Sequence, residues 1–271
     1  MKAGNPPRTP WFGLLFWGFG LAMGIGFSLG WLPEANSAHG HGIDRVINYL
    51  LVTTGILFLS GCYVLGKFVM RYGRGEAQPN SKVSAKAEAA WAIVPVILMC
   101  AISEVGVLAM GLPVFTQIYG EPEEGFNEVE VVGKQFEWLV RYPGPDGVFG
   151  EVDHAKVHDL RNPVGLVKED PAAKDDIVVR GMVHVPVDRM TVVRLRSLDV
   201  LHSFTVPLMR VKQDTVPGFT AFTQFTPEVT GPFELACAEL CGLGHYRMQG
   251  TILVESEEDF EQWLSKQEPW L

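Results

Sequence analysis

The sequence predicts a membrane-anchored all-β protein, in which N-terminal transmembrane helices precede a Greek-key β-sandwich. Hydrophobic residues make up 47% of the 271-residue chain and its mean hydropathy is +0.14, which is high for a wholly soluble protein. Three apolar blocks before about residue 120 are long enough to span a bilayer. Short runs rich in β-forming residues, punctuated by Pro, Gly and Asp, follow them. We therefore expect a membrane domain over residues 1–120 and an exported sandwich over residues 121–271.

The first apolar block covers residues 11–32 and follows Lys2 and Arg8. A basic lead before an apolar stretch also describes a secretory signal peptide, but this block is longer than the apolar region of an ordinary signal. Small residues also recur at every fourth position, which allows another membrane helix to pack closely. These features favour a retained helix, and a signal peptide remains the alternative. The small residues are Gly18, Ala22, Gly26 and Gly30.

The second and third blocks, at about residues 46–72 and 89–112, are expected to form a transmembrane hairpin. Because basic loops stay in the cytoplasm, the loop between the two blocks is predicted to be cytoplasmic. Lys2 and Arg8 place the N-terminus on the same side. The chain is thus predicted to cross a bacterial inner membrane several times and to carry its C-terminal domain on the periplasmic side. The basic residues of the loop are Lys67, Arg71, Arg74, Lys82 and Lys86.

Three polar or reactive residues fall inside these apolar blocks. Cys62 and Cys100 are expected to serve as small apolar packing residues. Glu104 differs, because a carboxylate within the membrane is costly and usually faces protein or a water path. A position near the outer interface is equally compatible with the sequence, so the role of Glu104 stays open.

The exported half carries most of the acidic residues, and the net charge of the chain is −9. An acidic chain is a poor partner for nucleic acid, whose phosphates bind basic surfaces. The acidic runs at residues 121–124 and 255–258 form either a solvated surface or a face that steers a basic protein. We expect a long loop between Tyr142 and Asp175 and one helix over residues 258–267. The expected strands lie at residues 128–142, 176–186, 191–197, 219–227, 233–240 and 250–256.

The densest cluster of metal-binding residues is CAELCGLGHYRM, at residues 237–248. It has the spacing C-x3-C-x3-H-x2-M, and His202 lies at the end of an earlier predicted strand. Thiolate, imidazole and thioether together favour copper. A mononuclear blue-copper site uses one Cys, two His and a weak Met. Since this loop has a second cysteine, two thiolates can bridge two copper ions.

Three other interpretations of this cluster stay open. Cys237 and Cys241 can form a disulfide in an oxidising periplasm, although that leaves His202, His245 and Met248 unexplained. The cysteines and histidines can form a Cys2His2 zinc site, although zinc has no use for a methionine. The two histidines can also be ordinary buried residues. No C-x-x-C-H motif occurs, so no c-type haem is expected on this chain.

From about residue 40 the chain resembles subunit II, the CuA-bearing subunit, of the haem–copper cytochrome c oxidases. The resemblance rests on the helix hairpin, on DVLHSFTVPLMRVKQDTVPG at residues 199–218 and on CAELCGLGHYRM. It implies a cupredoxin-like sandwich with a binuclear copper centre, and a magnesium ion at the border with subunit I that the Glu239 side chain helps to bind. The implied copper ligands are Cys237 and Cys241 as bridges, His202 and His245 as caps, Met248 on one copper and the Glu239 carbonyl on the other.

The resemblance also implies the function. The chain would accept electrons from cytochrome c, or a similar periplasmic donor, and pass them to haem in subunit I, which reduces oxygen to water. The chain itself would be a relay without the oxygen-reducing site, in a complex with subunit I, other oxidase subunits and membrane lipid.

Two further features carry over from the family, each beside an ordinary explanation. In KQFEW, at residues 134–138, the family has two tryptophans, the first being the usual point where electrons enter; here Phe136 replaces it and Trp138 remains, and both also suit a strand core. Glu88 in EAAWAIVP occupies the position that marks the mouth of a proton path, or is a carboxylate favoured by a helix N-terminus. Asp199 contributes either to an acidic docking face or to a turn.

Two alternative functions keep the copper site. One is the CuA subunit of a haem–copper nitric oxide reductase, which the replaced tryptophan and the extra helix leave open. The other is a stand-alone membrane-tethered copper-binding protein, which would not need a helix face lined with small residues. Comparing oxygen with nitric oxide consumption by the intact complex separates the first alternative from the oxidase.

Overall fold

The computed structural model describes residues 11–74 and 83–271. Lys2, Arg8 and Lys82, which support the predicted topology, lie outside the described residues. The chain separates into two compact units. The first, called the membrane unit below, comprises residues up to 33 and residues 44–111; the second, the sandwich unit, comprises residues 34–43 and 112–271.

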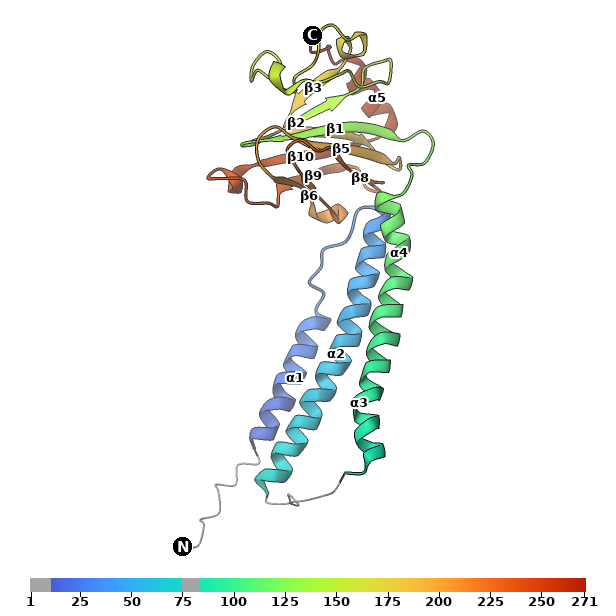
Figure 1. Ribbon diagram of the computed structural model, residues 1–271, viewed down its shortest axis with the longest axis vertical. Coiled ribbons are helices and arrows are strands. Elements are labelled where there is room, and N and C mark those ends of the chain that lie inside the picture. Colours follow the sequence, from blue (N-terminus) through green and yellow to red (C-terminus); the bar gives the residue numbers. More distant parts are fainter. Residues whose placement is uncertain (1–10, 75–82) are drawn as a thin grey trace. The chain divides into compact units, whose positions relative to one another are not determined.

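The apolar helices precede every strand, and one further helix follows the last strand (Figure 1). Two are long and apolar enough to cross a membrane: Ala38–Gly73, and Ala85–Tyr119 taken as one continuous helix. Both helices are longer than the apolar blocks predicted from the sequence, because the less apolar residues that flank each block are also helical. The N-terminal helix has 17 residues, at the short limit of a membrane span. The helical segments are α1 (Phe12–Ser28), α2 (Ala38–Gly73), α3 (Ala85–Met99), a π-helical turn (Cys100–Val105) and α4 (Gly106–Tyr119).

Helix α1 packs on α2 through glycines. A Cβ atom at Gly13 would overlap Met70, and one at Gly20 would lie 3.3 Å from Cβ of Cys62. The Trp17 indole donates a hydrogen bond to the Tyr63 carbonyl at 3.2 Å. The small-residue face predicted for helix packing is a different one, since nothing among the described residues lies within 4 Å of a Cβ built at Gly18, Gly26 or Gly30.

Helices α2 and α3 meet at the π-helical turn. The Tyr49 hydroxyl of α2 donates a hydrogen bond to the carbonyl of Ile102 in this turn. Gly106, just after it, has no room for a side chain beside the Tyr49 ring. A π-turn inserts an extra residue into a helix and changes which side chains share a face. Glu104 lies in this turn, and the rest of the chain leaves its side chain exposed.

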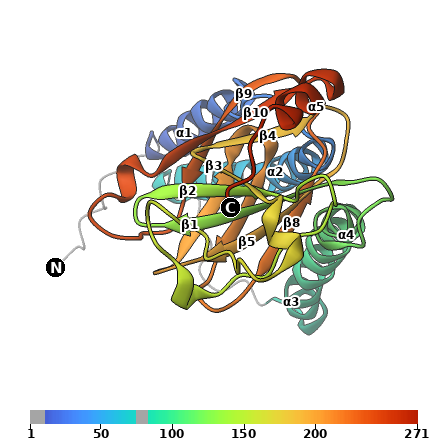
Figure 2. The ribbon, with the colours of Figure 1, turned by 90° about the horizontal axis from the view of Figure 1, so that it is seen from above.

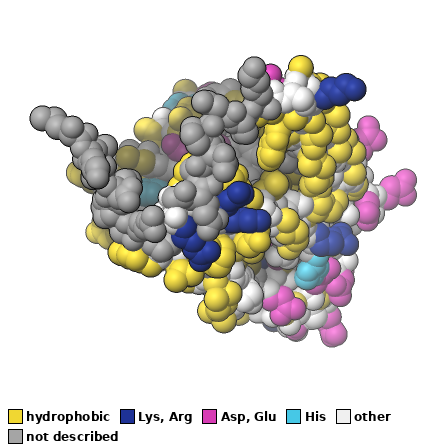
Figure 3. Space-filling model, turned by 90° about the horizontal axis from the view of Figure 1, so that it is seen from below, with side chains coloured by type: hydrophobic (Ala, Val, Ile, Leu, Met, Phe, Trp, Pro, Cys, Tyr) yellow, Lys and Arg dark blue, Asp and Glu magenta, His cyan; other side chains and the backbone are white. Residues whose placement is uncertain are grey.

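Apolar side chains dominate the exposed surface of these helices. Figure 3 views the molecule from below and shows these side chains with a group of Lys and Arg side chains among them. Trp91, for example, is 79% exposed although it lies in an apolar helix. Such a surface is suited to lipid or to other membrane subunits rather than to water.

The sandwich unit contains two five-stranded sheets, seen from above in Figure 2. Their strand orders are β3-β2-β1-β5-β8 and β4-β10-β9-β6-β7. Most neighbours are antiparallel, whereas β1 and β5, and β4 and β10, run parallel. Apolar helices followed by this β-sandwich confirm the predicted fold class. The strands are β1 (Asn127–Lys134), β2 (Glu137–Tyr142), β3 (Ile177–Arg180), β4 (Met182–Pro186), β5 (Thr191–Ser197), β6 (His202–Val206), β7 (Val211–Thr215), β8 (Ala221–Phe225), β9 (Gly231–Cys237) and β10 (Gln249–Glu255).

Two of the predicted strands are broken in the structure. The run at residues 176–186 divides at Gly181, whose φ of +72° suits glycine, so that β3 and β4 join different sheets. The run at residues 128–142 divides at Gln135 and Phe136, which form the turn of the β1–β2 hairpin. This turn lies beside the candidate metal centre described below.

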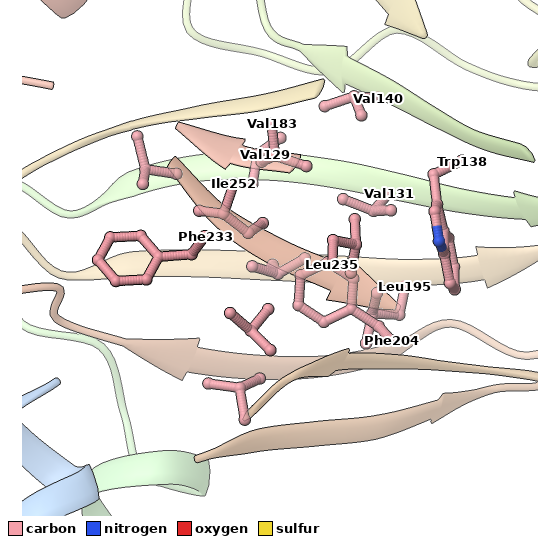
Figure 4. Packing of buried hydrophobic residues seen from close by; sticks show 14 of the residues in the cluster. Val129, Val131, Trp138, Val140, Val183, Leu195, Phe204, Phe233, Leu235 and Ile252 are labelled. Atoms are coloured by element: carbon pink, nitrogen blue, oxygen red, sulfur yellow. The ribbon is translucent and has the colours of Figure 1, made fainter. Parts of the chain in front are cut away.

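The sandwich core consists of side chains that alternate along the strands, many of which Figure 4 shows. Val129 and Val131 of β1 face the same interior as Phe204 of β6 and Leu235 of β9, and all four are fully buried. Each buried side chain of this size contributes about 1.5–3 kcal/mol relative to exposure. The core therefore provides a rigid frame for the loops at its ends.

The predicted long loop after Tyr142 is packed rather than loose. A second apolar cluster, including Val164 and Leu166, covers the outer face of β1, β2 and β3. Beside it the Arg141 guanidinium forms ion pairs with Glu130 at 2.8 Å and with Asp176 at 3.1 Å. Burial opposes ionisation of Glu130, but Arg196 and Arg141 together hold its pKa below the usual range. Burial raises the pKa of Asp176 to about 6.

Two segments distant in sequence complete the sandwich unit. Residues 34–43 lie against it: the Ser37 hydroxyl donates to the Met209 carbonyl at 2.7 Å, and the His41 imidazole lies 2.8 Å from the Glu228 carboxylate. At the other end of the chain is helix α5 (Glu257–Ser265), whose Trp263 stacks on His184 with ring centroids 3.7 Å apart. The sandwich unit is thus completed by residues 34–43, around the start of α2, and by a helix that follows the last strand.

Candidate metal centre

The candidate centre lies where β6 and β9 pair. His202 begins β6, and Cys237 ends β9 opposite Phe204 of β6. The loop at residues 238–248 then returns the chain to β10. Hydrogen bonds close the base of this loop, from the Cys237 amide to the Met248 carbonyl at 3.2 Å and from the Ala238 amide to the Ser203 carbonyl at 3.1 Å.

The five side chains singled out in the sequence lie together. The sulfur atoms of Cys237 and Cys241 are 3.9 Å apart. Nδ1 of His202 is 4.0 Å from the Cys237 sulfur, and Nδ1 of His245 is 3.6 Å from the Cys241 sulfur. The Met248 sulfur is 3.7 Å from that of Cys241. Each thiol therefore has one imidazole beside it, and the thioether lies beside one of the two thiols.

Glu239 contributes its backbone to the same cluster. Its carbonyl oxygen lies 3.2 Å from the Cys237 sulfur, so the loop directs a main-chain acceptor toward the thiols. The Glu239 side chain is half-buried.

The cluster is shielded from water. His202 is fully buried, Met248 is 1% exposed, and Cys237 and Cys241 are 9% and 4% exposed, while His245 is half-buried. Both cysteines are free, and their sulfur separation greatly exceeds the roughly 2.05 Å of a disulfide. Among the described residues His202, Cys237 and Cys241 place ligand atoms within 4.8 Å of one another, which a metal ion can bridge.

The donor atoms fit copper. Burial, with the neighbouring Cys237, raises the pKa of the Cys241 thiol to about 11, so two adjacent thiolates need a bound cation to neutralise them. The thioether of Met248 is a ligand for soft metals such as copper, and imidazole is also a common copper ligand. A four-ligand zinc site would use only the cysteines and histidines and would leave Met248 without a role.

Asp199 orients His202, a role that the sequence interpretation missed. The Asp199 carboxylate lies 2.8 Å from Nε2 of His202. Backbone amides of Gln135 and Val200 donate to the same carboxylate, each at 2.7 Å. Although burial opposes ionisation, these donors and His202 hold the pKa of Asp199 below its usual range. The D-x-x-H spacing is the signal that could have revealed this pair, because carboxylates commonly fix the second nitrogen of a ligating histidine.

The two aromatic candidates for receiving electrons occupy different environments. Trp138 is fully buried and meets the His202 ring edge-on, with centroids 6.0 Å apart. Phe136 is half-buried and packs against Gly242 and Gly244 of the metal loop. Of the two residues, only Phe136 is partly exposed.

Exposed apolar side chains surround the loop, which the sequence interpretation also missed. Leu240 and Tyr246 are each 78% exposed and Leu243 is 98% exposed. These three residues lie between or next to the candidate ligands in the sequence. Because the ligands face inward in this short loop, their neighbours face outward. Large exposed apolar residues around a buried site are typical of a surface that contacts another protein.

The remaining candidates lie on the helices. Glu88 is exposed in the first turn of α3, where Ser84 caps the helix by accepting a hydrogen bond from the Ala87 amide at 3.3 Å. Cys62 packs against α1, and Cys100 begins the π-helical turn. The packing role expected for Cys62 agrees with its contact to Gly20.

Comparisons with known proteins cover both parts of the chain. The family description "Cytochrome C oxidase subunit II, periplasmic domain" matches residues 128–256, and "Cytochrome C oxidase subunit II, transmembrane domain" matches residues 22–106. An alternative cytochrome c oxidase subunit 2 of Bradyrhizobium diazoefficiens is 35% identical over 238 residues, covering 88% of this chain and 83% of the relative. A cytochrome c oxidase subunit 2 of Cereibacter sphaeroides is 29% identical over 257 residues, covering 90% and 80%.

A solved structure is also similar. The crystal structure of the periplasmic domain of subunit II of cytochrome oxidase from Bradyrhizobium japonicum is 28% identical, with a TM-score of 0.40. The match covers 54% of this chain and 95% of that domain.

Proposed function

The chain belongs to the cytochrome c oxidase subunit II family, and from this premise we propose that it carries electrons into the haem-bearing subunit of an oxygen reductase. The donor is cytochrome c or a similar periplasmic carrier, and the partner subunit reduces oxygen to water. The single observation that carries the proposal is the cluster of two thiols, each with an imidazole beside it and one with a thioether.

The proposed ligands follow from these contacts. Cys237 and Cys241 would hold the two copper ions between them, and His202 and His245 would each serve one ion. Met248 would be a weak ligand of one ion, and the Glu239 carbonyl, 3.2 Å from the Cys237 sulfur, would serve the other. When bound, the copper pair supplies one-electron transfer.

The chain contributes a site that needs little rearrangement when its charge changes. Hydrogen bonds at the base of the loop and the carboxylate behind His202 hold the donors in place. Burial keeps water, which would reorganise with each change in charge, away from the sulfur atoms. With these donors each copper ion would have no open position for oxygen, so the chain would act as a relay.

Other residues take supporting roles in this proposal. The Glu239 side chain helps to bind a magnesium ion shared with subunit I. Trp138 and Phe136 are the candidates for receiving electrons from the donor, and Phe136 is half-buried beside the metal loop. Glu88 opens a proton path at the cytoplasmic end of α3, and the sandwich unit lies on the periplasmic side of a bacterial inner membrane.

The test is metal content and electronic structure. The full chain, purified in detergent after expression with copper, should hold two copper ions and be purple. Its paramagnetic spectrum should show one unpaired electron shared by two copper nuclei. A chain with one copper ion, or a colourless zinc protein, would reject the assignment.

The acceptor is tested on the intact complex. Consumption of oxygen, with cytochrome c as donor, should greatly exceed consumption of nitric oxide. The reverse result would assign the chain to a nitric oxide reductase. If no haem-bearing subunit copurifies with the chain from its native membrane, the chain is a stand-alone copper protein.

A further inference from the structure

The β1–β2 hairpin contributes no candidate ligand, yet it contacts both segments that do. Gly133 of β1 lies against the His202 ring so closely that a Cβ there would be 2.8 Å from its Cδ2 atom. Two residues later, the hairpin turn carries Gln135 and Phe136. The turn therefore lies between the His202 segment and the metal loop.

Gln135 is bonded to both segments at once. Its backbone amide donates to the Asp199 carboxylate at 2.7 Å, and the other oxygen of that carboxylate is 2.8 Å from Nε2 of His202. Its side-chain amide donates to the Cys241 carbonyl at 2.6 Å. A continuous series of hydrogen bonds thus runs from His202 through Asp199 and Gln135 to Cys241.

The adjacent ring completes the contact. Phe136 packs against Gly242 and Gly244, and side chains at either glycine would collide with Gln135 or Phe136. Gly242 also has a φ of +133°, which other residues rarely adopt. The loop between Cys241 and His245 is thus shaped by the hairpin turn as well as by its own sequence.

We propose that Gln135 is a positioning residue that fixes the separation between the His202 segment and Cys241 in the metal loop. His202 and Cys241 are 39 residues apart in sequence, and the β6–β9 pairing reaches Cys237 but not Cys241. Cys241 lies inside the loop, away from the hydrogen bonds that close its base, and the Gln135 side chain holds it there. The proposal rests on the proposed copper centre, because fixed separation matters most for a metal pair that shares its ligands.

The first experiment uses the metal-free full chain in detergent, so that it does not depend on copper. The alkylation rate of Cys241 is followed by mass spectrometry in the wild type, Gln135→Ala and Gln135→Glu. The second variant keeps the size of the side chain but replaces its N–H donor with an oxygen. Both variants should raise the rate roughly tenfold, as expected when one hydrogen bond that restrains the loop is lost. Gln262→Ala, an exposed glutamine of α5, is the matched control and should not change it.

The second experiment uses the copper-loaded full chain. Both Gln135 variants should retain two copper ions, while the hyperfine pattern of the paramagnetic spectrum becomes less symmetric and the reduction potential shifts relative to Gln262→Ala. Near-ultraviolet circular dichroism checks that the sandwich is folded, and Gln135→Glu replaces Gln135→Ala if the latter is not.

The outcomes separate the two proposals. If both Gln135 variants match Gln262→Ala in alkylation rate, spectrum and potential, Gln135 has no positioning role. If the wild-type chain does not hold two copper ions, the proposed function fails, and the alkylation rates alone still decide whether Gln135 restrains the loop.

Discussion

The Asp199 carboxylate lies 2.8 Å from Nε2 of His202, and this contact leaves Nδ1 of the same ring facing the Cys237 sulfur. The negative charge behind the ring favours the more positive, oxidised state of a bound metal pair. The Asp199 carboxylate therefore contributes both to the orientation of this histidine and to the charge behind it.

The first prediction concerns that charge. Asp199→Asn should retain two copper ions and raise the reduction potential by about 60 mV, equivalent to about 1.4 kcal/mol for one electron. Redox titration of the full chain measures it, with Glu258→Gln, an exposed acid in α5, as control. An unchanged potential would show that the carboxylate does not act on the metal pair.

The thioether provides the second prediction. Met248→Leu should retain copper but raise the potential by tens of millivolts, because a hydrocarbon replaces a weak electron-pair donor. Met248→Gln, which supplies an oxygen donor, should shift the potential in the opposite direction. Loss of all copper in both variants would contradict a weak-ligand role, because weak ligands tune a site without holding it together.

Gly244 allows a test of loop packing. A methyl group there overlaps the Phe136 ring, so Gly244→Ala should lower the free energy of unfolding of the metal-free chain by roughly 1–3 kcal/mol. Phe136→Leu should relieve part of that loss, giving a coupling energy of at least about 0.5 kcal/mol in a double-mutant cycle. Denaturant unfolding followed by near-ultraviolet circular dichroism measures it. Strictly additive effects would show that the two residues do not touch.

The raised pKa of Asp176 predicts that the free energy of unfolding depends on pH. Its pKa is about 6 in the folded chain and about 3.8 when unfolded, so between these values the folded chain holds a proton that the unfolded chain releases. The protonated group contributes its full stabilisation below about pH 4, and this stabilisation is lost as the pH rises through about 6. The total loss in the free energy of unfolding is at most about 3 kcal/mol.

The variant Asp176→Asn removes this dependence. The difference in unfolding free energy, wild type minus variant, should therefore fall as the pH rises from about 4 to about 6. Unfolding of the metal-free chain at several pH values in this range measures the difference. A difference that stays constant would contradict the raised pKa, whereas the ionised Glu130 affects both proteins equally and cancels.

The contact between α1 and α2 can be tested by cross-linking. A Cβ at Gly20 lies 3.3 Å from Cβ of Cys62, close to the roughly 3.5–4.5 Å of a disulfide. Gly20→Cys should form a disulfide with Cys62 on mild oxidation, detected as a cross-linked peptide by mass spectrometry. Gly18→Cys, on the face without contacts among the described residues, should not. Cross-linking would also show that α1 remains in the mature protein, as expected for a retained helix.

The sequence predicted the parts of the structure that depend on neighbouring residues. The apolar blocks identified the helices, and the β-rich runs identified most strands, because both patterns repeat over a few residues. Residues 176–186 form one β-rich run in the sequence, whereas the pairing of β3 and β4 with different sheets divides it at Gly181.

The helix contacts were also harder to predict, because they depend on a partner helix that is distant in sequence. Gly18, Ala22, Gly26 and Gly30 share a face by spacing alone, but the face that meets α2 is the one where Gly13 and Gly20 fit against Met70 and Cys62. Periodicity reveals that a close-packing face exists, and only the shape of the partner helix selects it.

By itself the sequence determined which chemistry this protein can perform, since the identity and spacing of Cys237, Cys241, His245 and Met248 specify soft ligands on one short loop. The tertiary structure decided how that loop is held: it placed His202 beside Cys237, Asp199 behind His202, and Gln135 between the two ligand-bearing segments. The physical reason is the range of the interactions. Ligand type is a property of each side chain, whereas the positions of ligands that are tens of residues apart depend on strand pairing, burial and hydrogen bonds that exist only after the chain has folded.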